Sequence, residues 1–95
     1  MTAKPNVTII IPAYNEEEGI ADVITQLQEL SENENYEILV IDDGSTDNIH
    51  KLATDTGVKV FRHPYNKGYG AALKTGVRNA KADIVLFMNA DILNE

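Results

Sequence analysis

The chain has 95 residues, no cysteine and a formal net charge of -7. This acidic balance argues against nucleic acid as a partner, because binding phosphates needs clustered lysines and arginines, and the absence of cysteine excludes disulfides, thiolate metal sites and cysteine nucleophiles. No apolar run approaches the roughly 20 residues that span a membrane, and the N-terminus lacks the apolar segment of a signal peptide, so the expected location is the cytoplasm.

Four apolar runs with the character of β-strands alternate with three helix-like segments. The strand-like runs are residues 7–11, 38–41, 58–61 and 84–88, and the helix-like segments are 20–30, a short stretch that ends at Gly57, and 70–80. The order βαβαβαβ predicts one α/β domain over residues 1–95, with three α/β/α layers resembling half of a Rossmann fold. Right-handed crossovers predict a mostly parallel sheet with the strand order 3-2-1-4.

The local pattern also predicts helix ends and buried faces. Asn15 is the expected N-cap of the first helix, ahead of three glutamates that favour a helix N-terminus. Gly57 is the expected left-handed residue after the second helix. The candidate caps of the second helix are Ser45, Thr46 and Asp47, and the expected buried side of the third helix is Leu73, Val77 and Ala80. The strand-like runs 7–11 and 84–88 are expected to lie in the core.

Each strand-like run is followed by a short acidic or polar turn. In a parallel sheet such turns meet at one edge, and in open α/β sheets that edge binds ligands. The turns are residues 12–17, 42–45, 66–70 and 89–91. The arrangement predicts a crevice that is rich in carboxylates and shaped for a nucleotide.

Individual turn residues suggest specific contacts. Asp42 and Asp43 precede Gly44, and a carboxylate there can accept a hydrogen bond from a nucleobase N–H or a ribose hydroxyl. The alternative is that one aspartate caps the next helix and the other is solvated. Tyr14 can stack on a base or pack half-buried. A phosphate or sugar can contact Lys67 or the N-terminus of the third helix.

The last turn has the pattern of a metal site. Asn89 and Asp91 are two residues apart, so an extended chain places their oxygen-bearing side chains on the same side. Mg²⁺ and Mn²⁺ take such oxygens together with substrate phosphates. His50 and His63 have no partner pattern around them, and both are expected on the surface.

Taken together, these turns resemble the family-2 glycosyltransferases of the GT-A fold. Within that family the chain looks most like the polyprenyl- or dolichyl-phosphate mannosyl- and glucosyltransferases. The segments that carry the resemblance are residues 10–17, 40–47, 66–76 and 82–91, in the family's order and over nearly the whole chain. The resemblance implies the N-terminal, nucleotide-sugar-binding half of an inverting enzyme that transfers a hexose from a UDP- or GDP-sugar.

The resemblance also implies roles by position. The nucleotide pocket would be lined by Pro12, Ala13, Tyr14 and Glu16. Asp43 would read the base with Asp42 beside it, and Lys67 and Gly68 would lie near the sugar or diphosphate. Asn89 and Asp91 would occupy the Asp-x-Asp motif that holds the donor diphosphate through Mg²⁺ or Mn²⁺.

Two departures from the family pattern alter these expectations. Position 89 is Asn where the family usually has Asp, and the loss of one anionic ligand should weaken metal binding. The chain ends at Glu95, before the acceptor half with its catalytic base, so no residue here is assigned a catalytic role and the isolated chain is expected to be inactive.

Other interpretations stay open from the sequence. One is a non-catalytic nucleotide-binding or self-associating module derived from the same fold. Another is a nucleotidylyltransferase, which would carry a basic, glycine-rich loop where this chain has residues 12–17. Because residues 84–88 are apolar throughout and are expected at or near a sheet edge, we also expect a homo-oligomer.

Overall fold

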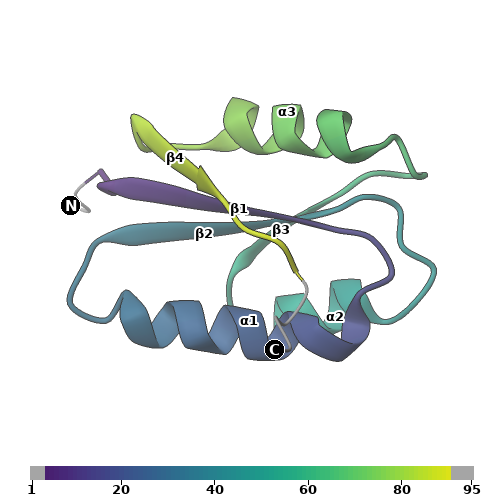
Figure 1. Ribbon diagram of the computed structural model, residues 1–95, viewed down its shortest axis with the longest axis horizontal. Coiled ribbons are helices and arrows are strands. Elements are labelled where there is room, and N and C mark those ends of the chain that lie inside the picture. The colour runs from purple at the N-terminus through teal and green to yellow at the C-terminus, as the bar shows by residue number, and fades with distance from the viewer. Residues whose placement is uncertain (1–3, 91–95) are drawn as a thin grey trace.

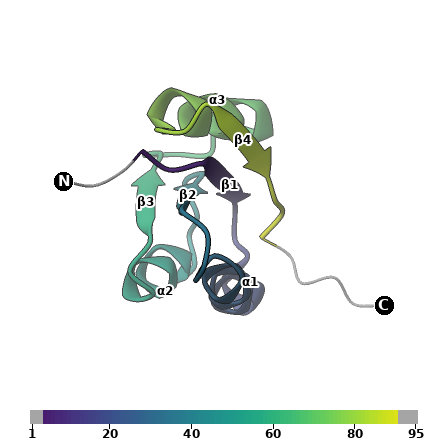
Figure 2. The ribbon, with the colours of Figure 1, turned by 90° about the vertical axis from the view of Figure 1, so that its left-hand side faces the viewer.

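The computed structural model describes residues 4–90, in which strands and helices alternate as expected. The elements are β1 (Val7–Ala13), α1 (Glu17–Leu30), β2 (Tyr36–Asp42), α2 (Ile49–Asp55), β3 (Lys59–Arg62), α3 (Tyr69–Asn79) and β4 (Ile84–Phe87). Helices α1 and α2 cover one face of the sheet and α3 covers the other (Figures 1 and 2). The predicted three-layer α/β/α arrangement is confirmed. No helix between residues 4 and 90 is long and apolar enough to cross a membrane.

The sheet has the predicted strand order, β3-β2-β1-β4, and every pairing is parallel. The central strand β1 runs beside β2 from the pair Val7–Tyr36 to the pair Ala13–Asp42. On its other side β1 pairs with β4. The direction of the strand order therefore reverses between β1 and β4, which lie side by side in the sheet (Figure 2).

Six of the seven residues of β1 are apolar, because helices cover both faces of the sheet around it, and the exception is the buried Thr8. Its side chains alternate between two separate cores. The core on the α1 and α2 side includes Ile9, Ile11, Ile20, Ile24, Val40 and Ile49. The core on the α3 side includes Ile10, Leu39, Ile41 and Ala72.

Helix α3 packs on the sheet through small side chains, which differs from the prediction. Its buried residues are Ala72 and Gly76. The predicted buried residues Leu73, Val77 and Ala80 are partly or substantially exposed, with Val77 at 50%. A Cβ on Gly76 would lie 2.4 Å from the Cγ2 of Ile10. The helix therefore approaches β1 so closely that its contact face has no room for larger residues.

Strand β4 is an edge strand in the described sheet and is more exposed than predicted. The side chains of Ile84 and Leu86 are 58% and 52% exposed, and Phe87 and Met88 are 46% and 43% exposed. The expectation that residues 84–88 lie in the core is wrong for the structure described here. An edge strand has a neighbour on one side only, and part of its apolar surface faces outward.

Candidate functional site

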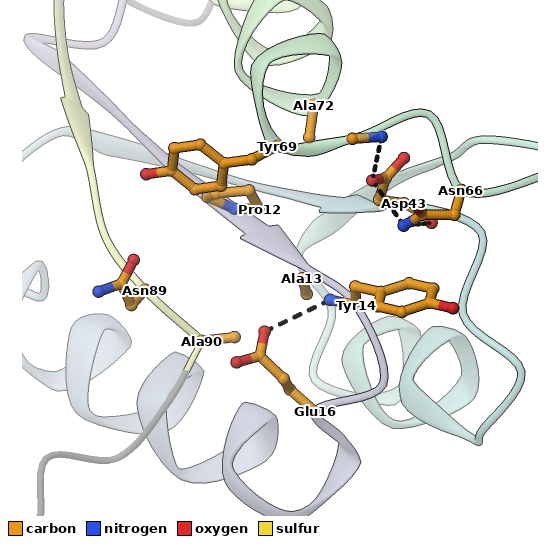
Figure 3. Close-up of a pocket in the computed structure, with 11 residues that line it drawn as sticks. Pro12, Ala13, Tyr14, Glu16, Asp43, Asn66, Tyr69, Ala72, Asn89 and Ala90 are labelled. Atoms are coloured by element: carbon orange, nitrogen blue, oxygen red, sulfur yellow. Dashed lines mark hydrogen bonds between the residues drawn. The ribbon is translucent and has the colours of Figure 1, made fainter.

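A pocket of about 370 Å³ lies at the carboxyl edge of the sheet, between the ends of β1, β2 and β4 and the start of α3 (Figure 3). Its volume is within the range of small-molecule sites. The residues that line it are Pro12, Ala13, Tyr14, Glu16, Asp43, Asn66, Gly68, Tyr69, Ala72, Asn89 and Ala90. Tyr69 and Ala72 lie on the α3 side, and Glu16 and Ala90 lie on the α1 side. All four turns that the sequence singled out contribute to this pocket.

The turns after β1 and β2 are bonded to each other. Asn15 has a φ of 53°, its amide donates to the Ser45 hydroxyl at 2.9 Å, and its side-chain oxygen accepts from the Thr46 amide at 2.8 Å. The Glu17 amide donates to Asp47 Oδ2 at 3.1 Å. The prediction that Asn15 caps the first helix is therefore wrong, because its side chain bridges to the next turn.

The N-terminus of the second helix differs from the prediction, whereas the residue after its C-terminus agrees with it. Its N-cap position is Asn48, and the side chain of Asp47 accepts from the Ile49 amide at 3.1 Å. Among the three candidate caps, Asp47 thus contacts the first turn. Gly57 follows the helix with a φ of 92°, which confirms the predicted left-handed residue.

Asp43 is the most heavily hydrogen-bonded side chain of the pocket wall. It is only 3% exposed, so protein groups and not bulk water supply its hydrogen bonds. Its Oδ1 accepts from His63 Nδ1 at 2.7 Å and from the Lys67 amide at 2.9 Å. Its Oδ2 accepts from Asn66 Nδ2 at 3.0 Å and from the Gly68 amide at 2.9 Å. A carboxylate has about four lone-pair positions, so protein donors use the full acceptor capacity of Asp43.

These hydrogen bonds determine the charge of Asp43. Burial alone would raise the pKa of its carboxyl group, because it removes the charged form from water. The hydrogen bonds from His63, Lys67 and Gly68 and the charge of His63 act in the opposite direction and outweigh burial, so the pKa lies below its usual value. Asp43 is therefore ionised at neutral pH.

His63 is buried, which contradicts the expectation of a surface histidine. It is 7% exposed and follows β3, where its amide continues the sheet by donating to the Asp42 carbonyl at 2.9 Å. Its ring bonds Asp43 through Nδ1 and the Thr75 hydroxyl through Nε2, at 2.8 Å.

Asp42 has no part in the pocket wall. Its side chain is fully buried, and Oδ1 accepts from the Ser45 amide at 2.9 Å. Its Oδ2 lies 3.4 Å from Arg62 Nε. Both aspartates are thus buried, so the alternative in which one of them is solvated is wrong. Asp42 supports the turn on which Asp43 is presented.

The loop that carries Lys67 and Gly68 lies directly against the turn after β2. Gly44 has a φ of 75°, and a Cβ there would lie 2.3 Å from the carbonyl carbon of Tyr65. Only glycine permits both that backbone conformation and that close approach. Gly68 lines the pocket, whereas the Lys67 ammonium lies 5.6 Å from the centre of the Tyr65 ring, and Lys67 is not among the lining residues.

One of the two predicted metal ligands lines the pocket. Asn89 lies on its wall, and Asp91 lies outside the described residues. Between residues 4 and 90 there is no cluster of three or more His, Cys, Asp or Glu side chains that could hold a metal ion. The amide oxygen of Asn89 and the carboxylate of Glu16 are hard oxygen donors on the same pocket, the donor type that Mg²⁺ and Mn²⁺ take.

Most of the residues predicted for the site come together in the pocket. They are Pro12, Ala13, Tyr14, Glu16, Asp43, Gly68 and Asn89, whereas Asp42 and Lys67 lie outside its lining. The lining residues without a predicted role are Asn66, Tyr69, Ala72 and Ala90. Tyr69 and Ala72 are three apart in a helix and so share a face. Once the start of α3 was placed at the site, this spacing could have identified both residues as candidates for the pocket lining.

Curated proteins similar to this chain include two lipid-phosphate glycosyltransferases. The chain is 34% identical over 90 residues to a dolichol-phosphate mannosyltransferase of Pyrococcus furiosus, covering 90% of this chain and 26% of that protein. It is 34% identical over 96 residues to an undecaprenyl-phosphate 4-deoxy-4-formamido-L-arabinose transferase of Aeromonas hydrophila, covering 93% of this chain and 29% of that protein. The chain thus spans well under half the length of these relatives.

Solved structures of GT-A glycosyltransferases superpose on most of the chain. One is glucosyl-3-phosphoglycerate synthase of Mycobacterium tuberculosis in complex with Mn²⁺, UDP and glucosyl-3-phosphoglycerate. It has a TM-score of 0.82 and 31% sequence identity, covering 95% of this chain and 35% of the synthase chain. The same enzyme has also been solved with UDP alone, at a TM-score of 0.81.

A family model supports the same conclusion over almost the whole sequence. The model for glycosyl transferase family 2 matches residues 8–95. The matched range contains all four turns that surround the pocket, and the strand order and fold agree with the solved GT-A enzymes. The chain belongs to glycosyl transferase family 2 and has the GT-A fold of its solved structural neighbours.

Proposed function

We propose that this chain binds the nucleoside diphosphate of a UDP- or GDP-sugar, as the donor half of an inverting hexosyltransferase. The observation that carries the proposal is the pocket itself. It lies at the reversal point of the strand order, where open α/β sheets bind ligands. Its wall combines aromatic rings, a buried ionised carboxylate and the first turn of a helix.

The base would occupy the end of the pocket that Tyr14 and Asp43 share. Tyr14 is 45% exposed and offers its ring for stacking. Because protein donors fill the acceptor positions of Asp43, a base N–H that bonds to it replaces one of them. The Asn66 amide is the donor best placed for replacement, since it belongs to an exposed side chain that lines the pocket.

The diphosphate would lie at the start of α3. Gly68 occupies the N-cap position of this helix and makes no side-chain cap, which leaves the first-turn amides to bond an anion. Lys67 precedes them and adds positive charge. A divalent cation held by Asn89 and Asp91 would neutralise the diphosphate and stabilise the departing nucleoside diphosphate.

We expect the 95-residue polypeptide to hold a donor without transferring its sugar. The curated relatives with transferase names are three to four times longer than the part that this chain matches, since it covers 26% of one and 29% of another. A non-catalytic nucleotide-binding or self-associating module is the second candidate. It is favoured by Asn89, a neutral side chain where the family pattern supplies an anionic metal ligand.

The test is calorimetric titration of UDP-glucose and of GDP-mannose into the chain, with and without Mn²⁺. We expect one of the two to bind, with a higher affinity in Mn²⁺. Tyr69→Ala should weaken binding, whereas Tyr65→Ala is the matched control, because both rings are about equally exposed and only Tyr69 lines the pocket. If neither donor binds in Mn²⁺, the proposed function is wrong.

A further inference from the structure

We propose that His63 is the positioning residue of this pocket, because it joins Asp43 to Thr75 and so holds the Lys67–Gly68 backbone in its binding shape. The inference rests on the proposed function for its ligand, and on geometry alone for its effect on the loop. His63 is not among the residues that line the pocket, so it acts through Asp43.

The imidazole connects three segments that are distant in the sequence. It belongs to the chain directly after β3, its Nδ1 contacts Asp43 after β2 at 2.7 Å, and its Nε2 contacts Thr75 in α3 at 2.8 Å. It is 7% exposed, so water cannot readily replace either hydrogen bond. The ring therefore fixes the rotation of the Asp43 carboxylate relative to α3.

The positions of the protons follow from the chemistry of the three groups. An ionised carboxylate accepts hydrogen bonds and cannot donate, so His63 carries its proton on Nδ1. In the neutral ring Nε2 then accepts from the Thr75 hydroxyl. If the ring gains a second proton, the hydroxyl can rotate and accept from Nε2–H. The connection therefore persists in both charge states of the imidazole.

The same order of carboxylate, imidazole and hydroxyl activates the nucleophile in hydrolases. In this chain Thr75 is absent from the pocket lining, as is His63. The arrangement is therefore suited to holding Asp43 and not to attacking a substrate.

Orientation of Asp43 determines where the loop lies. The Lys67 amide bonds Oδ1 and the Gly68 amide bonds Oδ2, so the loop is bound to both oxygens of one carboxylate. Rotation of that carboxylate would break these bonds together. Gly68 both lines the pocket and precedes the first turn of α3, so its displacement would alter the proposed diphosphate contact.

The test compares His63→Leu with His63→Asn in the full chain. Leucine removes both hydrogen bonds, whereas the amide nitrogen of asparagine stands at about the position of Nδ1 and can still donate to Asp43. We expect His63→Leu to accelerate amide exchange of Lys67 and Gly68, while Ile10 and Leu39 in the core keep their protection. The same variant should weaken binding of UDP or GDP in Mn²⁺ by at least about 10-fold, near the lower end of the effect of losing a hydrogen bond to a charged group. His63→Asn keeps the hydrogen bond to Asp43 but lacks the one to Thr75, so it should restore part of both properties.

Two further measurements keep the inference testable if His63→Leu does not fold. In the wild-type chain at neutral pH, nitrogen chemical shifts of His63 should show a protonated Nδ1. Thr75→Val removes one hydrogen bond at nearly constant shape and should loosen the same two amides, and Thr75→Ser should restore them.

Several outcomes would overturn the inference. One is a neutral His63 ring that is protonated on Nε2. Another is amide exchange that rises equally in the loop and in the core of His63→Leu. The third is a His63→Asn variant with the same exchange rates and nucleotide affinity as His63→Leu. If the wild-type chain binds neither UDP nor GDP, the proposed function fails. The exchange rates and imidazole shifts then decide by themselves whether His63 orders the loop.

Discussion

Asp43 carries an unusual number of hydrogen bonds for one carboxylate, and this bears on how it can be tested. Its replacement by alanine leaves the ring of His63 and the amides of Lys67 and Gly68 without their acceptor. We expect Asp43→Ala to weaken UDP or GDP binding by about 1–3 kcal/mol, the range for a hydrogen bond to a charged group. Calorimetry measures this change. Asp83→Ala is the control, because that side chain is 87% exposed, and equal affinities in the two variants would contradict the assignment.

Substitution of Asn89 should change the affinity for the nucleotide in a predictable direction. Asn89→Asp supplies an anionic oxygen at the pocket wall, and a divalent cation prefers such an oxygen to a neutral amide. We expect this variant to bind the nucleotide more tightly in Mn²⁺ and with little change in a chelator. Asp91→Ala should bind the nucleotide with the same affinity in Mn²⁺ and in a chelator. A wild-type chain that already binds Mn²⁺ as tightly as Asn89→Asp would show that the neutral residue imposes no penalty.

At the scale of the elements, α3 is restricted by its contact with β1. Alanine in place of glycine inside a helix usually adds about 1 kcal/mol of stability. At Gly76, however, the new methyl group would overlap Ile10, which is fully buried, and such overpacking typically costs about 1–3 kcal/mol. We therefore expect Gly76→Ala to lower the free energy of unfolding, as measured by urea denaturation.

The same helix provides the matched control. A Cβ on Gly70 would have no heavy atom within 4 Å, so Gly70→Ala should leave stability unchanged or increase it. If both variants stabilise the chain equally, the close contact between α3 and β1 is not as tight as described.

Glu37 joins three elements through one half-buried side chain and should make stability depend on pH. Its Oε1 accepts from the Thr8 hydroxyl and from the Lys81 amide, at 2.7 Å and 3.0 Å. Burial raises its pKa, but these hydrogen bonds and the charge of Lys59 lower the pKa by more, so the net shift is downward. A lowered pKa adds stability above the unfolded value of about 4.3, and this stability is lost as the pH falls through the folded value.

We therefore expect the free energy of unfolding to decrease when the pH is lowered from about 5 to 3. Asp43 acts in the same direction, because its pKa is also lowered. Urea denaturation at several pH values measures the decrease. Glu37→Gln cannot titrate, so its profile should be shallower, and identical profiles for variant and wild type would exclude Glu37 as a source.

The sequence predicted elements and turns well because each depends on short-range patterns. Apolar runs identify the strands, although β1 continues through Pro12 to Ala13, and alternation of strands and helices leads to the strand order. Contacts between turns were not predictable in this way. Asn15 suited a helix cap locally, but a hydrogen bond to Thr46 across the sheet edge has no local signature. For the same reason the burial of His63 was missed, since its partners lie 20 and 12 residues away.

For the whole molecule, the exposed edge at β4 has consequences for association. Open strand edges recruit other chains, and exposed apolar side chains add to this tendency. We expect a homodimer or higher oligomer in light scattering after size exclusion at micromolar concentration. Leu86→Lys should shift it towards monomer, because Leu86 is on β4 and 52% exposed. Leu30→Lys is the control, since Leu30 is 71% exposed but lies on α1. A monomeric wild type would contradict the expectation.

The pairing of β1 with β4 has a consequence for the order of events in folding. During synthesis β1 is made well before one of its two partners, since Val7 pairs with Ile84. Such long-range pairing is slow, because chain entropy is lost before the contact forms. The pocket draws on residues from Pro12 to Ala90, so a nascent chain cannot complete it before residue 90 has been made. A nucleotide bound as proposed would add stability only to molecules in which β1 and β4 have already paired.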